Sequence, residues 1–408
     1  MAAVAGLRGT GDWATDERPK NFREMIMWRN PNGNAPIFAL MSRVQKESTD
    51  DPEFSWWDEP SDIIRLQING ALSSSETTIV VDSSDPSTSA PGNVWGIATH
   101  LKPGDLLLVE PSTDNATYDH EIIEVDTVIG ATSFTAKRGR AGTTAASISD
   151  DGYITKIGSS FSEGTGAPTS ASRNPIKYFN YTQIFKDTYE LTGTAEQTKT
   201  RTGDPVKNDK KRKAFDHARD IEMALLYGQR NETTGDNGKP LRTMGGLRSF
   251  IPSNTTTIFG SVTVTNFLNA VYPVFDFDSP AGDERIGFCG NVALNTLNLM
   301  IQTDSNTQIQ WGGVIKQFGM EFREFIMPQG RLLLRSHPLL NRHGLYRESM
   351  FIIDFAALRW RPMRNRDTKF KDNVQSADED LRRGYWQTEA GLEVDFGGLT
   401  CGYLGELD

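Results

Sequence analysis

The sequence predicts an α+β protein with a small all-β domain inserted into one of its loops. Three observations predict this class. Short β-rich runs separated by turn residues fill residues 62–160, and one long amphipathic helix covers about 207–227. Shorter helices and strands follow without the regular alternation of a parallel βαβ fold. At 408 residues the chain is long enough for roughly two to three domains.

Residues 1–48 are expected to form an extended arm. Gly, Asn and Pro recur at 29–36, and apolar side chains such as Trp13 and Trp28 are too scattered to bury one another. The segment is therefore either disordered or docked on another molecule, and the spaced aromatic residues favour docking on a neighbour.

Residues 62–160 are expected to fold as a small β-barrel or sandwich. Extended chain flanks them on both sides, at 49–61 and 161–177, which is the pattern of a domain inserted into a loop. The predicted strands lie at 77–81, 106–109, 121–125, 133–136 and 153–157, with Gly and Asp in the turns between them.

A strand at 178–193 and a helix at about 207–227 follow the predicted loop. The helix begins after Asp204 and Pro205, which are a capping residue and a favoured first residue, and it ends before Gly228. Its length would be about 30 Å at 1.5 Å per residue. The apolar stripe that defines it consists of Ala214, Ala218, Ile221 and Leu225, with Phe215 and Glu222 at its border.

The last third of the chain mixes short helices with strands. One helix begins at Thr265 and must end near Tyr272, because Pro273 cannot continue it, and a second begins at Asn291. The run 350–353 is apolar on both faces, as in a buried strand. Further strands are predicted at 312–326, 331–334, 358–361 and 392–396.

Charge and cysteine content limit the classes of function. The net charge is -10, and residues 62–160 alone hold thirteen acidic and six basic side chains, which argues against gripping a nucleic-acid backbone directly. No apolar run is long enough to span a membrane. Cys289 and Cys401 are expected to be buried free thiols in a protein from a reducing compartment such as a cytoplasm.

No enzyme signature is found, so no catalytic residue, cofactor or metal is predicted. The sequence has no GxxxxGK[ST] phosphate loop, no GxSxG and no HExxH. His100 and His120 match no standard metal-ligand spacing and are expected at the surface. His337 and His343 flank an ordinary turn.

Basic residues open the long helix, where the helix dipole disfavours positive charge. Three interpretations remain open: a solvated helix face, a neighbouring subunit's acidic segment, or nucleic acid. The residues concerned are Lys207, Lys210, Lys211, Arg212 and Lys213.

Specific strings resemble one family. The run YTQIFKDTYELTGTAE at 181–196 resembles the SU10-like major head proteins, a branch of the HK97-fold phage capsid proteins. RDIEMALLYGQ at 219–229 and RTMGGLRSFI at 242–251 are similar to that family's spine helix and the turn after it, and RGRAGTTAASISDDGYI at 138–154 resembles a β insertion in some members. Together these strings place most of residues 50–400 within the resemblance.

The resemblance implies a capsid subunit that forms hexamers and pentamers of an icosahedral head around double-stranded DNA. Residues 49–61 and 161–177 would form the extended loop, 178–251 and 346–408 the peripheral domain, and 252–345 the axial domain. The acidic insert would face outward. Expected partners are copies of the chain itself, a portal, a scaffolding protein and decoration proteins; because the predicted arm starts almost at Met1, a separate scaffold is expected.

Aromatic and basic residues are the candidates for the subunit interface. Trp13 and Trp28 in the arm, and Phe54, Trp56 and Trp57 at the loop entry, are expected to be exposed, because such residues commonly anchor interfaces; core positions remain the alternative, most evenly for Trp56 and Trp57. The five basic residues of the helix complete the set. Two other functions are less well supported: a tail or decoration subunit, and a carbohydrate-active enzyme, for which no carboxylate pair can be named.

Overall fold

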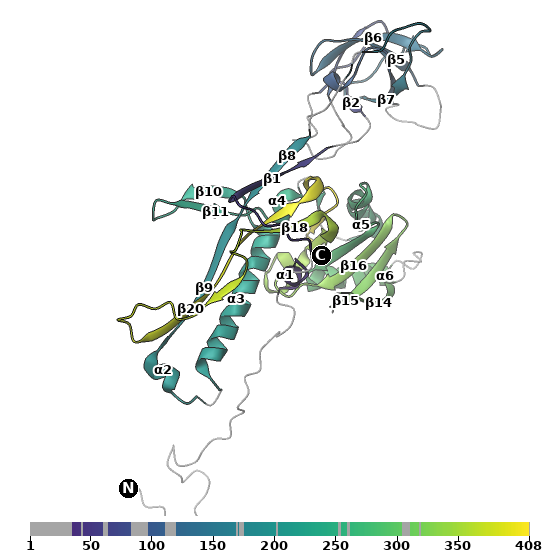
Figure 1. Cartoon of the computed structure of the whole chain (residues 1–408). Coiled ribbons are helices and arrows are strands. Elements are labelled where there is room, and N and C mark those ends of the chain that lie inside the picture. The colour runs from purple at the N-terminus through teal and green to yellow at the C-terminus, as the bar shows by residue number, and fades with distance from the viewer. Residues whose placement is uncertain are drawn as a thin grey trace, which may run out of the picture.

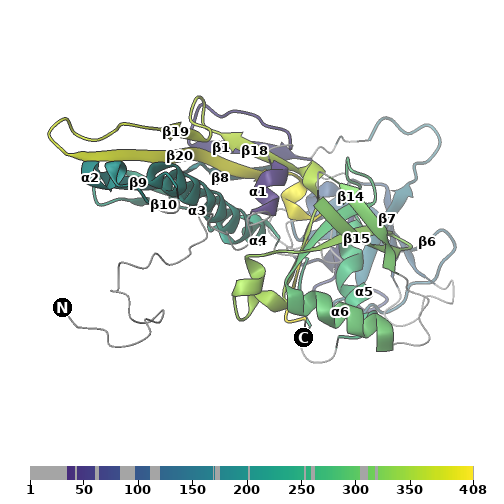
Figure 2. The ribbon, with the colours of Figure 1, turned by 90° about the horizontal axis from the view of Figure 1, so that it is seen from below.

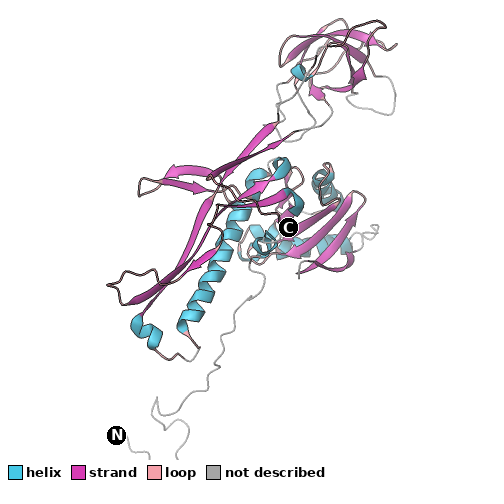
Figure 3. Ribbon diagram, viewed as in Figure 1, coloured by secondary structure: helices cyan, strands magenta, loops and turns pink. Residues whose placement is uncertain are grey.

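The computed structural model describes residues 35–41, 44–59, 64–82, 97–110, 120–168, 170, 175–200, 203–251, 254–258, 262–303, 311–317 and 320–407. Trp13, Trp28 and most of the predicted arm lie outside these residues. The described chain forms a large body, a small β-barrel and a two-stranded ribbon between them (Figure 1). Strands predominate throughout, with one long helix (Figure 3). The predicted α+β class is confirmed.

The long helix α3 (Pro205–Tyr227) crosses one half of the body. Asp204 caps it, because its side chain accepts hydrogen bonds from the backbone N–H groups of Val206 and Lys207, and Gly228 ends it. The prediction for this helix is confirmed. It packs along a sheet whose long strand β20 (Leu381–Val394) pairs with β9 (Gln183–Thr192), β18 (Leu358–Pro362) and β19 (Lys369–Lys371).

A seven-stranded sheet forms the other half of the body. In order it contains β12 (Thr255–Thr257), β21 (Gly402–Gly405), β17 (Met350–Ile353), β13 (Glu284–Cys289), β16 (Gly330–Ser336), β15 (Met320–Met327) and β14 (Trp311–Gln317). The helices α5 (Val264–Val271) and α6 (Asn291–Thr303) lie on one side of this sheet (Figure 2). After α5 the chain turns into the 3₁₀ helix η2 (Tyr272–Phe275), as expected from Pro273.

This sheet is buried on both faces, which explains the apolar run at 350–353. Phe351 and Ile353 join the core beneath α1 (Pro36–Met41) and α3, whereas Met350 and Ile352 join the core beneath α5 and α6. All four side chains are buried, so the predicted buried strand is confirmed.

The described residues between 64 and 159 form a six-stranded barrel. The sheet order is β2 (Arg65–Gln67), β7 (Tyr153–Ser159), β4 (Asp105–Val109), β5 (Ile122–Val128), β6 (Ser133–Arg140) and β3 (Thr78–Val80). An antiparallel bridge between Ile68 and Val81 joins the first strand to the last and closes the barrel. A short 3₁₀ helix, η1 (Ala98–His100), lies beside it. The barrel has its own apolar core, which shares no residue with the two cores of the body.

Two antiparallel pairs project from the body (Figure 1). The strands β1 (Glu53–Asp58) and β8 (Ile176–Tyr181) form the ribbon that leads to the barrel, and β10 (Asn231–Thr234) and β11 (Pro240–Thr243) form an exposed hairpin. The single strand predicted at 178–193 is wrong in one respect: it divides at Thr182, where β8 pairs with β1 and β9 turns to pair with β20.

The remaining elements are short: α2 (Gly193–Gln197), α4 (Leu247–Phe250), η3 (Leu340–Arg342), η4 (Tyr346–Glu348), η5 (Phe355–Ala357) and η6 (Asp395–Gly398). The strand predicted to reach residue 396 ends at Val394. Phe396 has a φ of 56° and Gly397 a φ of 55°, which no strand can accommodate.

Candidate assembly surface

The inner face of the ribbon is packed against the body. The side chains of Phe54 and Trp56 are only 7% and 6% exposed, and the indole Nε1 of Trp56 donates to the carbonyl of Val394 at 3.1 Å. Gly391 makes this close packing feasible, because a Cβ at that position would lie 2.5 Å from the ring of Phe54. The prediction that Phe54 and Trp56 are exposed is therefore wrong, since both cover the surface of β20.

The outer face of the ribbon carries a row of aromatic side chains. Trp57 is 60% exposed and lies opposite Lys177, while Phe179 and Tyr181 follow on the same face with ring centroids 5.8 Å apart. Arg230 stacks 3.8 Å from the centroid of Phe179 and donates to its carbonyl oxygen at 2.7 Å. We term Trp57, Phe179 and Tyr181 the aromatic row.

The basic residues of α3 have partners within the chain. Lys207 lies 3.8 Å from Asp204, Arg212 lies 3.1 Å from Asp209 and Lys213 lies 3.8 Å from Asp216. Each acidic side chain lies within one helical turn of its basic partner. Together they offset the unfavourable placement of positive charge at the start of the helix. Lys210 and Lys211 contact aromatic rings, with Nζ 3.5 Å from the centroid of Phe370 and 5.9 Å from that of Phe215.

Two buried histidines form contacts that the sequence did not predict. His337 Nε2 lies 2.7 Å from the carboxylate of Glu222, and His217 lies between Asp187 and Thr388, 2.7 Å from each. No local pattern indicated them, because the partners of the two histidines are between 30 and 171 positions away along the chain. Both side chains are buried within the body, where these contacts join separate segments of the chain.

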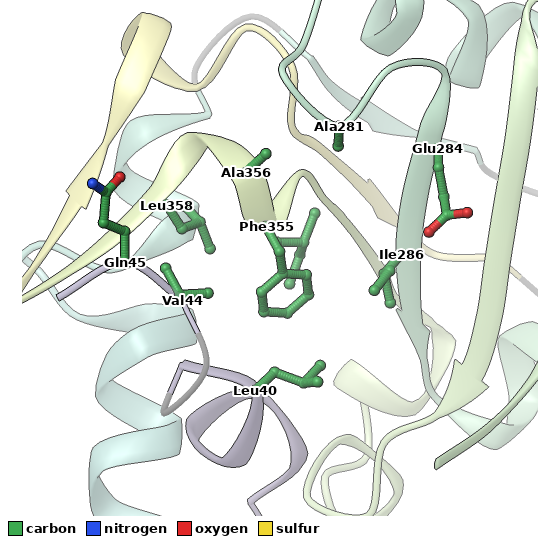
Figure 4. A pocket seen from close by; sticks show the side chains of 10 residues that line it. Leu40, Val44, Gln45, Ala281, Glu284, Ile286, Phe355, Ala356 and Leu358 are labelled. Atoms are coloured by element: carbon green, nitrogen blue, oxygen red, sulfur yellow. The ribbon is translucent and has the colours of Figure 1, made fainter. Parts of the chain in front are cut away.

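An apolar cavity of about 390 Å³ lies where α1 meets the seven-stranded sheet (Figure 4). Its one carboxylate, on Glu284, forms an ion pair with Arg331 at 2.5 Å. The cavity has no second acidic group for acid–base chemistry. It is lined by Leu40, Val44, Gln45, Ala281, Glu284, Ile286, Ile353, Phe355, Ala356 and Leu358.

The described residues offer little for redox or metal chemistry. Within them no group of three or more His, Cys, Asp or Glu side chains is arranged to hold a metal ion. Cys289 and Cys401 are buried free thiols, as predicted, and burial raises the pKa of each thiol, to about 12 for Cys401. Among the helices that the structure describes, none has the length and apolar character to cross a membrane.

Comparison with known proteins identifies the family. The model of the SU10 major capsid protein family matches residues 7–397. A major capsid protein of Pseudomonas phage PaMx41 is 25% identical over 417 residues, which cover 100% of this chain and 94% of the relative.

Two solved structures align with almost the whole chain. One, from Microbacterium phage Oxtober96, has a TM-score of 0.46 at 11% identity and covers 97% of this chain and 98% of its own. The other, the capsid of the native GTA particle, has a TM-score of 0.45 at 8% identity. It covers 98% of this chain and 99% of its own.

The predicted resemblance is confirmed, and the family excludes both alternatives, the carbohydrate-active enzyme and the tail or decoration subunit. The chain belongs to the SU10 major capsid protein family and is a structural protein of the virion shell, not an enzyme.

Proposed function

We propose that this capsid protein assembles as hexamers and pentamers that close an icosahedral head around double-stranded DNA, and that the aromatic row is one of its contacts with a neighbouring copy. The observation that carries the proposal is the exposure of Trp57, 60%, on a ribbon whose other face buries Phe54 and Trp56 against the body. Aromatic side chains that cannot be buried within one chain are common anchors of protein interfaces.

A shell needs many such contacts. A head-to-tail contact joins one patch of a subunit to a different patch of the next, and it closes a ring when the rotation between subunits is suitable. Each contact contributes little, but a subunit held by several neighbours dissociates far more slowly than one held by a single contact. Trp13 and Trp28 would add contacts from the arm, and the basic start of α3 would face the acidic barrel of a neighbour or the packaged DNA.

In this proposal the domains are those expected from the sequence. Residues 1–48 form the arm, 49–61 and 161–177 the extended loop, and 62–160 the inserted domain on the outside of the shell. Residues 178–251 and 346–408 form the peripheral domain, and 252–345 the axial domain. The division is supported by the separate core of the barrel and by the ribbon that connects it to the body. Portal, scaffolding and decoration proteins are the further partners, and assembly takes place in the host cytoplasm.

The test compares assembly of the full-length chain with that of two variants. The wild-type chain, purified alone or after co-expression with the neighbouring phage genes, is expected to give closed shells or regular capsomers in negative-stain electron microscopy and light scattering. Trp57→Ala is expected to shift the population toward monomers with an unchanged circular dichroism spectrum. Ile129→Ala, which truncates a 61% exposed side chain in a turn of the barrel, is the matched control and is expected to assemble normally.

The outcomes separate the two parts of the proposal. Normal assembly of Trp57→Ala would remove Trp57 from the interface without touching the shell function. A wild-type chain that stays monomeric even with the neighbouring genes present would contradict the assembly itself.

A further inference from the structure

Asp58 lies at the end of the ribbon that leads to the barrel, opposite Ile176. It is the last residue of β1, and its carboxylate accepts hydrogen bonds from the backbone N–H groups of Phe396 and Gly397 in η6. Its second oxygen, Oδ2, is buried without a hydrogen-bond partner among the described residues. A buried carboxylate oxygen that has lost water and gained no donor disfavours the charged form of the group.

The backbone that binds Asp58 is itself constrained. Phe396 and Gly397 both have φ values in the left-handed region, 56° and 55°, which a residue with a side chain such as Phe396 seldom adopts. Tyr178 of β8 closes the space beside them, because a Cβ on Gly397 would lie 2.6 Å from its hydroxyl. The two hydrogen bonds to Asp58 therefore hold η6 in a shape that it would not adopt by itself.

Negative charge surrounds Asp58. The carboxylates of Asp395 and Glu393 both repel its charged form. Two arginines of β18 neutralise these neighbours: Arg359 lies 3.0 Å from Asp395 and 3.5 Å from Glu393, and Arg361 binds Glu393.

Neither guanidinium group forms an ion pair with Asp58. The second contact of Arg361 is with Glu47, at 2.8 Å, in the chain that precedes β1. We term the contact between Asp58 and η6 the joint. Tyr178 is the remaining titratable group there. Burial, with a contribution from the charge of Asp58, raises the pKa of its hydroxyl. No cation forms an ion pair with Asp58 in the part of the chain that the structure describes. Asp395, Glu393 and Glu47 thus share the two guanidinium groups, and neither group neutralises Asp58.

We propose that Asp58 is a proton-binding switch at the barrel end of the ribbon: protonation of its carboxyl group tightens the attachment of the β1–β8 ribbon to η6, and loss of the proton loosens it. A protonated Asp58 no longer repels the carboxylates of Asp395 and Glu393. The position of the ribbon relative to the body then responds to pH at one identified residue. The switch belongs to the isolated subunit and does not depend on the proposed assembly.

The expected pH dependence follows from the direction of the shift. Burial, and next the charge of Asp395, raise the pKa of Asp58 from 3.8 to about 6. The pKa of Asp58 is higher when Asp58 contacts η6 (the closed joint) than when this contact is broken (the open joint). Between these two pKa values the closed joint therefore binds a proton that the open joint does not. Its added stability is complete below the ordinary pKa and is lost as the pH rises through about 6. Burial raises the pKa values of Glu393 and Asp395 as well, so they act in the same direction.

Hydrogen–deuterium exchange of the full-length chain tests the switch. The backbone amides of Phe396 and Gly397 exchange only when their bonds to Asp58 open, so their protection, corrected for the intrinsic pH dependence of exchange, reports on the joint. For wild type we expect about fourfold greater protection at pH 5.5 than at pH 8.0. Both conditions lie above the sequence pI of about 5.2, where the protein keeps a net negative charge.

Variants identify the group that titrates. Asp58→Asn cannot take up the proton and is expected to lose most of the response, keeping only the smaller contribution of Glu393 and Asp395. Asp50→Asn is the matched control; its side chain is 76% exposed beside Arg364, and the wild-type response should remain. Asp395→Asn keeps Asp58 but removes a negative neighbour, and it is expected to move the midpoint of the response to lower pH.

Equal protection of wild type at both pH values, or an unchanged response in Asp58→Asn, would overturn the proposal. If Asp58→Asn does not fold, an unchanged midpoint in Asp395→Asn would overturn it.

Discussion

Glu222 Oε1 and His337 Nε2 lie 2.7 Å apart although 115 positions separate the two residues in the chain, and both side chains are fully buried. The same carboxylate accepts hydrogen bonds from the backbone N–H groups of Ile37 at 2.8 Å and Phe38 at 2.6 Å. One buried side chain of α3 therefore joins α1, the long helix and the segment after β16.

Loss of this carboxylate is expected to be strongly destabilising. Glu222→Ala leaves two backbone N–H groups and an imidazole buried without their acceptor, and breaking such a buried pair costs about 3–5 kcal/mol. Urea denaturation followed by tryptophan fluorescence measures the loss. The control is Glu232→Ala, which breaks an exposed ion pair with Arg242 and should cost less than about 1 kcal/mol. Equal losses in the two variants would show that Glu222 does not hold the three segments together.

The barrel is expected to fold when it is separated from the rest of the chain. Fifteen buried apolar side chains among its described residues form one core of their own, and its first and last strands are joined. A fragment of residues 62–160 should give dispersed amide signals in a two-dimensional NMR spectrum. Within that fragment Phe134→Ala, which truncates a side chain with 0% exposure, should cost about 3–5 kcal/mol. A fragment with collapsed signals would mean that the barrel needs the body.

The barrel is also expected to lose stability in acid through one ion pair. Glu121 and Arg138 are 2% and 6% exposed, with 2.6 Å between each carboxylate oxygen and a guanidinium nitrogen. Burial by itself would raise the pKa of Glu121, but hydrogen bonds from Arg138 and from the backbone of Gly139 and Ala146 outweigh it and lower the pKa.

Because the folded value is the lower one, this stabilisation is complete above the ordinary pKa of 4.5 and is lost as the pH falls through the folded value. Circular dichroism of the barrel fragment between pH 7 and pH 2 measures this loss. Arg138→Met should destabilise the barrel by about 3–5 kcal/mol at pH 7 and remove this acid dependence. Lys137→Met is the control, because Lys137 is 49% exposed, and its acid profile should match that of wild type.

A methyl group at Gly391 is expected to displace the ribbon. A Cβ there would lie 2.5 Å from the ring of Phe54 and 2.7 Å from the carbonyl oxygen of Tyr181, so β1 and β8 must move. Gly391→Ala should cost about 1–3 kcal/mol and increase proteolytic cleavage between the body and the barrel. Gly313→Ala, where a Cβ would meet no atom within 4 Å, is the control. Unchanged cleavage in Gly391→Ala would show that the ribbon does not depend on this close contact.

Local patterns in the sequence were sufficient for the regular elements. The spacing of Ile221 and Leu225 and the capping residues Asp204 and Gly228 predicted α3 to within two residues at its start. The uninterrupted apolar run at 350–353 predicted a strand buried on both faces. Such elements are encoded by the period of the chain itself, 3.6 residues for a helix and 2 for a strand, and the family could be recognised from strings that span them.

Only the tertiary structure decided which aromatic side chains are exposed and which charged side chains are buried. Trp56 and Trp57 are adjacent and of the same type, so no alternation indicated which of them faces the body; the position of β20 buries Trp56 and leaves Trp57 exposed. Asp58 and Glu222 resemble ordinary surface acids in the sequence. Their partners lie more than a hundred residues away, and a contact of that kind exists only when the whole chain has folded.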